Sequence, residues 1–336
     1  MSGTRRYALG DVELQSGETL RDAVLAYRTY GALNEARDNA VVIPTFYTGT
    51  LERNEAYFGA GRAIDPARHF VVNVALFGNA ESTSPSTASP PQDKSRFPKT
   101  TFFDNVACQR RLVEDEQGVR RVRLVMGWSM GGCQSFQWAA QCPDLVDAIL
   151  PVCGSARTSP HNVLFLEGVK AALLADPAFK GGDYDDPPVA GLKAFGRVYL
   201  GWAYSQGFFR EHRYRDLGFE TLEDMLTDWE NDQLSWDAND LLHKLWTWQR
   251  GDVGAGPAFG GDTDKALASI RARAIVMPST TDLYFRVEDN RREVARMPNA
   301  ELRPYETDWG HCVASGDNDP AFHRFLDAAA AELLAD

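Results

Sequence analysis

Ser129 is the residue of this sequence best placed for nucleophilic chemistry. It is the centre of a Gly-Trp-Ser-Met-Gly pattern over 127–131, which follows an apolar run over 123–126 and precedes an amphipathic stretch over 134–141. A serine at the apex of a tight strand-to-helix turn needs glycine two positions before and after it, because the two backbones pass closely. The pattern predicts a serine that forms an acyl-enzyme, with the backbone N–H of Met130 stabilising the oxyanion.

An acid and a base further along the chain can complete a catalytic triad. Asp282 comes just after an apolar stretch over 274–278, and His311 follows the last expected strand, over 301–305. Each is expected at the C-terminal end of a strand, in the order Ser, Asp, His that accompanies this serine motif. We expect His311 to take the serine proton and Asp282 to hold the imidazole in the accepting tautomer. Asp308 is the alternative acid.

The elements that position these residues alternate between short apolar runs and helical stretches. Candidate strands cover 23–30, 40–44, 70–75, 123–126 and 148–152. Alternation of this kind predicts a mostly parallel central sheet flanked by helices, an α/β fold.

A helical insertion interrupts this pattern in the second half of the chain. Over 165–261 the strand signals fade and aromatic residues become frequent, so we expect a helical lid there and a core made of 1–164 and 262–336. Aromatic residues at helical spacing more often build a core or a dimer face than a substrate pocket. A last helix is expected over 320–334.

Composition argues against several other classes of function. The chain has 336 residues, 44% of them hydrophobic and 24% charged, which is typical of a soluble globular protein. Its net charge of −12 predicts no nucleic-acid partner. We find no secretory signal and no apolar run of about 18 residues, so we expect no membrane association and a cytoplasmic location. Five widely spaced cysteines without a CxxC pair predict neither a disulfide framework nor a metal site.

The sequence resembles the homoserine O-acetyltransferase family of α/β hydrolases. The matching segments are 27–34 (Tyr-Arg-Thr-Tyr-Gly-Ala-Leu-Asn), 38–42, 61–65, 129–132, 237–240 and 282–284. The resemblance implies an α/β-hydrolase fold with a helical lid that often forms dimers, and a tunnel through which the acyl donor reaches the serine. It also implies a second oxyanion donor in the loop after 40–44, which here is the backbone N–H of Tyr47.

Three positions depart from the family pattern. Trp128 stands directly before the nucleophile, where the family usually has glycine. Cys312 follows the expected base, where the family has an aspartate for the amino group of homoserine. Tyr204 lies in Ala-Tyr-Ser-Gln over 203–206, where the family's arginine holds the carboxylate of homoserine. We take Trp128, Tyr204 and Cys312 as candidate substrate-contacting residues, and the loss of both charged groups favours water as the acyl acceptor.

Three hypotheses about function follow. The first is a serine hydrolase that cleaves small short-chain acyl esters, without a cofactor and as a homodimer formed through the lid. The second is an acyl-CoA-dependent O-acyltransferase acting on homoserine, serine or a related alcohol, with acyl-CoA as co-substrate. The third is a binding or scaffold protein that keeps the fold without the chemistry.

Overall fold

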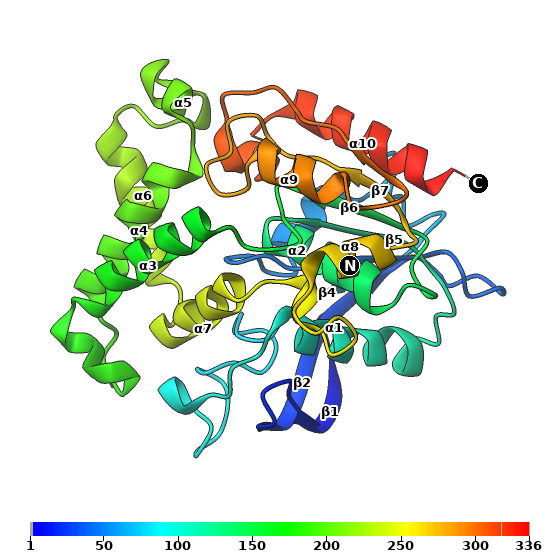
Figure 1. Ribbon diagram of the computed structural model, residues 1–336. Helices are drawn as coiled ribbons and strands as arrows, with labels where there is room; N and C mark the ends of the chain where they lie inside the picture. Colours follow the sequence, from blue (N-terminus) through cyan, green and yellow to red (C-terminus); the bar gives the residue numbers. More distant parts are fainter. Residues whose placement is uncertain (1–2, 317, 336) are drawn as a thin grey trace.

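The centre of the computed structural model is one eight-stranded sheet (Figure 1), and the structure describes residues 3–316 and 318–335. The strands are β1 (Arg5–Glu13), β2 (Thr19–Tyr30), β3 (Ala40–Pro44), β4 (Phe70–Val74), β5 (Val122–Trp128), β6 (Ala148–Val152), β7 (Arg273–Val276) and β8 (Ala300–Leu302). Their spatial order is β1-β2-β4-β3-β5-β6-β7-β8. Strand β2 pairs antiparallel with both of its neighbours, β1 and β4. All the other neighbouring strands in this order pair in parallel.

Helices cover both faces of this sheet, which explains its apolar sequence. Strands β3, β4 and β6 are buried at every position, as expected for parallel strands between two helical layers. Side chains alternate between the faces: Val41 and Ile43 join one hydrophobic cluster, and Ala40 and Val42 join the other. Helices α1 (Phe102–Arg111), α2 (Met130–Gln141) and α8 (Thr263–Ser269) pack in the second cluster, and α10 (Pro320–Leu334) packs in the first.

The two N-terminal strands extend beyond the expected pattern. The sequence prediction missed β1 and began β2 at residue 23, whereas β2 begins at Thr19. Strand β1 lies at the edge of the sheet and is mostly exposed, so its sequence carries charges and glycine in place of an apolar run. Its pairing with β2, from Arg5 opposite Tyr27 to Glu13 opposite Thr19, supplies the order that the local sequence lacks. At the other end of the chain, β8 covers Ala300–Leu302 and is shorter than the expected 301–305.

The helical segment between β6 and β7 forms a layer at one end of the sheet, left of the strands in Figure 1. It consists of α3 (Pro160–Leu174), α4 (Val189–Ala203), α5 (Gln206–Arg210), α6 (Leu222–Leu234) and α7 (Ala238–Gln249). Its first helix begins at Pro160, earlier than the expected 165, because Ser159 caps it and proline suits the first turn. Its buried side chains share the cluster that contains α10, so the lid and this face of the core pack as one apolar interior.

Helix α9 (Val287–Val294) lies near β8 and completes the helices of the core. The expected last helix over 320–334 is confirmed as α10. Among the described residues, no helix has the length and apolar character that crossing a bilayer requires.

Candidate active site

The turn between β5 and α2 holds Ser129 in a strained conformation. Its φ is 59° and its ψ is −124°, backbone angles that residues other than glycine rarely adopt. A Cβ atom on Gly127 would lie 2.3 Å from the carbonyl carbon of Gly131, and one on Gly131 would lie 2.7 Å from the Pro44 oxygen. Both positions therefore require glycine, and the turn presents Ser129 at the C-terminal end of the sheet beside a cavity that it lines.

Asp282 and His311 form a buried pair at the neighbouring strand ends. The Nδ1 atom of His311 lies 2.7 Å from Oδ2 of Asp282. The other carboxylate oxygen, Oδ1, accepts the backbone N–H groups of Tyr284 at 2.7 Å and Phe285 at 3.1 Å. Since these amides fix one oxygen and the carboxylate can only accept, Nδ1 of His311 carries the proton and Nε2 remains free to accept another. His311 and Ser129 line the same cavity.

Several contacts fix the backbone of His311. Gly310, with a φ of 62°, packs so closely on the lid that an added Cβ would lie 2.8 Å from the amide nitrogen of Ser205. Trp128 donates its indole N–H to the carbonyl oxygen of His311 at 3.2 Å, and the two rings stack with centroids 5.1 Å apart. Trp128 therefore positions His311 as well as lining the cavity.

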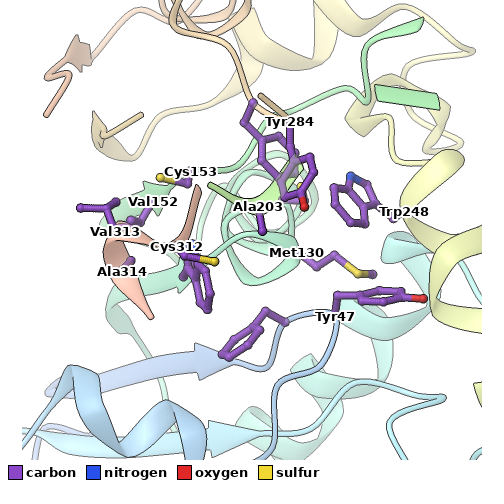
Figure 2. Close-up of a cluster of buried hydrophobic side chains, with 14 of the residues drawn as sticks. Tyr47, Met130, Val152, Cys153, Ala203, Trp248, Tyr284, Cys312, Val313 and Ala314 are labelled. Atoms are coloured by element: carbon purple, nitrogen blue, oxygen red, sulfur yellow. The ribbon is translucent and has the colours of Figure 1, made fainter. Parts of the chain in front are cut away.

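Two backbone N–H groups near the serine turn have no acceptor of their own in the described residues, so both are available as donors. Met130 begins α2, so its N–H has no partner within the helix, and Tyr47 follows β3 in the loop that packs against the start of α2. Gln134 of α2 donates to the Thr45 oxygen at 2.8 Å, and the Tyr47 hydroxyl donates to the Leu241 oxygen at 2.8 Å. Neither amide donates to an acceptor in the described ranges of the chain. Figure 2 shows Tyr47 beside Met130, from two segments far apart in the sequence.

A cysteine lies next to Asp282 and His311. The Cys153 sulfur, an Asp282 oxygen and a His311 nitrogen all lie within 4.8 Å of one another, which is close enough for a metal ion. Burial raises the pKa of the Cys153 thiol well above its ordinary value, and the nearby Asp282 carboxylate raises it further. Zinc binds a thiolate, whereas this thiol is neutral, and the nearby His311 nitrogen is already hydrogen-bonded to Asp282. The arrangement therefore fits a histidine–carboxylate pair better than a metal site.

The cavity next to Ser129 has a volume of about 580 Å³ and contains the three predicted substrate-contacting residues. Trp128, Tyr204 and Cys312 all line it. Cys312 and Tyr204 share a side-chain hydrogen bond, and burial raises the pKa of the Cys312 thiol to about 12. Asp308, the alternative acid, lines a different surface hollow near Gly207, and the carboxylate that contacts His311 belongs to Asp282.

Sequence reasoning missed one wall of this cavity, which helix α6 provides. Asp228, Trp229, Asp232 and Gln233 line it, at spacings of one, three and one residues. Positions i, i+1, i+4 and i+5 lie on one face of a helix, so the spacing was available as a signal. The direction in which that face points depends on packing that the sequence does not display.

A mostly parallel sheet with a strained serine turn at a strand end is the architecture of the α/β hydrolases. The chain belongs to the α/β-hydrolase fold family, whose pattern matches residues 41–313. It is 35% identical over 331 residues to an ethyl acetate hydrolase of Pseudomonas veronii, covering 97% of this chain and 94% of that one. It is 30% identical over 314 residues to a homoserine O-acetyltransferase of Trichormus variabilis, covering 89% and 86%.

Among solved structures, the acetyl esterase MekB superposes with a TM-score of 0.96 at 35% identity, over 99% of this chain and 97% of that one. The relatives thus include esterases and homoserine O-acetyltransferases, which confirms the resemblance drawn from the sequence.

Proposed function

We propose that this protein is a serine carboxylesterase that cleaves short-chain acyl esters through an acyl-enzyme on Ser129. The observation that carries the proposal is the buried pair of His311 and Asp282, whose Nδ1 and Oδ2 atoms are 2.7 Å apart, with His311 lining the same cavity as Ser129. Relatives named ethyl acetate hydrolase and acetyl esterase, each 35% identical over nearly the whole chain, support an acetyl or similarly short acyl group.

In this mechanism His311 acts through Nε2 and Asp282 acts through Nδ1. Nε2 takes the Ser129 proton while the oxygen attacks the ester carbonyl, and Asp282 stabilises the imidazolium that forms. The backbone N–H groups of Met130 and Tyr47 stabilise the oxyanion. The imidazolium then protonates the departing alcohol, and water activated by the same nitrogen opens the acyl-enzyme.

A second candidate is transfer of the acyl group to an alcohol, which the homoserine O-acetyltransferase relatives favour. Against it, the residues at the family's two anchoring positions, Tyr204 and Cys312, carry no charge. Burial raises the pKa of each, so that both stay neutral. An amino-acid acceptor would thus lack the ion pairs that orient it, and water is the favoured acceptor. The intact triad residues leave a binding protein without chemistry as the weakest alternative.

The experiment compares two reactions of the purified protein. One assay supplies ethyl acetate and measures acetic acid, and the other supplies acetyl-CoA with homoserine and measures O-acetylhomoserine. The proposal predicts that ethyl acetate hydrolysis has the higher kcat/KM. Formation of O-acetylhomoserine at a higher kcat/KM would replace the esterase with the transferase.

We also propose that the protein is a homodimer formed through the lid, with the lid assigned to 165–261 and the core to 1–164 and 262–336. Exposed large hydrophobic side chains support this, because in the described residues they all lie on helices α3, α4 and α6, with Leu164 on the part of α3 that begins just before residue 165. They are Leu164, Leu174, Val189, Val198 and Leu222. Light scattering on the wild type and on Leu164→Glu tests it, with a dimer expected for the first and a monomer for the second.

A cytoplasmic location and the absence of a cofactor belong to the same proposal. All five cysteines are free thiols, which suits a reducing compartment. Activity that persists after dialysis against a chelator would support cofactor-free hydrolysis, and activity restored only by an added metal would contradict it.

A further inference from the structure

Helix α6 gives the cavity a wall whose chemistry the hydrolysis steps do not use. Asp228, Trp229, Asp232 and Gln233 lie on one face of the helix and line the cavity that contains Ser129. Because the triad and the two N–H donors already account for the reacting ester, this wall is available to contact the part of the substrate beyond the ester group.

The charges of the cavity lining are mostly negative. Glu52, Asp228 and Asp232 line it, and Arg53 is the cation that accompanies them. Arg53 is engaged by Asp232, 2.6 Å away, and by the Thr48 oxygen at 2.8 Å. For Glu52 and Asp228, the described part of the chain offers no ion-pair or hydrogen-bond partner to the side chain. Partial burial, together with the charge of Asp232, raises the pKa of Asp228. Because Arg53 and Asp232 neutralise each other, the carboxylates of Glu52 and Asp228 leave this side of the cavity with a net negative potential.

Gln233 adds an unused acceptor to this wall. Its side chain is 1% exposed, and its Nε2 donates to Oδ2 of Asp232 at 3.2 Å. Its Oε1 has no donor among the residues that the structure describes. A buried acceptor without a partner is costly, so this oxygen favours a donor or a positive charge nearby.

Aromatic rings complete the same region. Trp229 packs against Tyr199 and Tyr204, with ring centroids 5.9 Å and 6.1 Å apart, and all three residues line the cavity. The faces of such rings attract cations, especially alkylammonium groups that are poorly hydrated. Carboxylates, an amide oxygen and aromatic faces therefore meet on one side of the cavity, and each of them favours a positively charged ligand group.

We infer that the α6 wall recognises a cationic group in the alcohol part of the ester, so that the enzyme prefers cationic esters and disfavours anionic acyl donors such as acyl-CoA. This inference rests on the proposed esterase function and specifies its substrate class. It also gives a reason for hydrolysis over CoA-dependent transfer, since the phosphates of acyl-CoA would meet the carboxylates at the cavity.

Three acetate esters of similar size test the inference. Acetylcholine carries a cation, 3,3-dimethylbutyl acetate is its neutral isostere, and the acetate ester of 3-hydroxypropanesulfonate carries an anion. We expect kcat/KM to decrease in that order, with a difference of about tenfold or more between cation and anion that shrinks as salt is added. Equal values for the three esters would overturn the inference while leaving the esterase function intact.

A double variant locates the effect on Glu52 and on Asp228 of the α6 wall. In Glu52→Gln/Asp228→Asn, the cation-to-anion ratio of kcat/KM should fall by about threefold or more, since both unpaired carboxylates are removed. Asp115→Asn, which neutralises an exposed carboxylate outside the cavity lining, is the control and should leave the ratio unchanged. An unchanged ratio in the double variant would contradict the assignment. Failure of the wild type to hydrolyse any of the three esters would overturn the esterase function and this inference together.

Discussion

Replacing Asp282 by asparagine tests how the base is held in its reactive state. The two side chains have the same shape, but one carboxylate oxygen becomes an N–H₂ group that can only donate. Oδ1 of Asp282 accepts two backbone N–H groups, at 2.7 and 3.1 Å, while Oδ2 accepts one imidazole N–H at 2.7 Å. The amide oxygen should keep the position that accepts two donors, because the reverse orientation would leave two buried amides facing a donor.

The orientation decides which nitrogen of His311 carries the proton. With the N–H₂ group facing the ring, Nδ1 must become the acceptor and Nε2 must carry the proton, so the ring cannot take the Ser129 proton. A loss of this kind amounts to about 10⁴-fold in kcat, equivalent to about 5 kcal/mol in the activation free energy. The fold should persist, since the two backbone hydrogen bonds of residue 282 are retained.

The assay is kcat and kcat/KM for a short-chain ester, with thermal unfolding as a check on folding. Asp308→Asn is the matched control, because Asp308 is the neighbouring carboxylate that does not contact His311. We expect Asp308→Asn to retain kcat within about threefold, in the range of a surface substitution. A folded Asp282→Asn enzyme with kcat within about tenfold of the wild type would refute this reasoning. A large loss in Asp308→Asn alone would assign the acid to Asp308.

Three further predictions concern a buried acid, two glycines and a thiol. Burial raises the pKa of Glu293 from 4.5 to about 7. The stability that the protonated Glu293 contributes is therefore full below pH 4.5 and falls by about 3 kcal/mol as the pH rises through 7. Between pH 4.5 and 8, chemical unfolding should show Glu293→Gln gaining stability relative to the wild type. Gly131→Ala should lower kcat by about 10²-fold, because the new Cβ would displace the backbone of the loop that holds Tyr47. Gly201→Ala is the control: this helical position is open, so alanine should raise the free energy of unfolding by up to about 1 kcal/mol. Cys312→Ala should keep measurable ester hydrolysis, unlike Ser129→Ala, because a thiol with a pKa of about 12 is not a thiolate at neutral pH.

Each of these predictions has an outcome that contradicts it. A constant stability difference between wild type and Glu293→Gln across the pH range would show that Glu293 titrates alike in both states. Normal turnover by Gly131→Ala would show that the turn tolerates a side chain there, and inactivity of Cys312→Ala with Ser129→Ala active would make the thiol the nucleophile. Lower stability of Gly201→Ala would mean that this helical position is not open.

The sequence predicts the three residues of the triad because each has a local signal. The glycines around Ser129 follow from the closeness of two backbones, and the order of Asp282 and His311 follows from where the strands end. The parallel sheet is also predictable, since strands buried on both faces are continuous apolar runs. Strand β1 has no such run, and only its pairing with β2 reveals it.

The contacts that position the base are beyond local sequence. The sequence places Trp128 near the substrate because it directly precedes Ser129. Its hydrogen bond to the His311 oxygen, however, depends on a segment about 180 residues away. The residues of the α6 wall have a helical spacing, yet only tertiary packing decides that Asp228 and Gln233 line the cavity that Ser129 also lines. Residues that act through packing between distant segments therefore come from the structure.

The central claim is that His311 and Asp282 activate Ser129 as the nucleophile. The most direct measurement is reaction of the folded protein with a fluorophosphonate, followed by peptide mass spectrometry to locate the adduct. The account predicts one adduct, on Ser129, that forms much more slowly in His311→Ala. An adduct on another residue, or equally fast labelling without the imidazole, would contradict it.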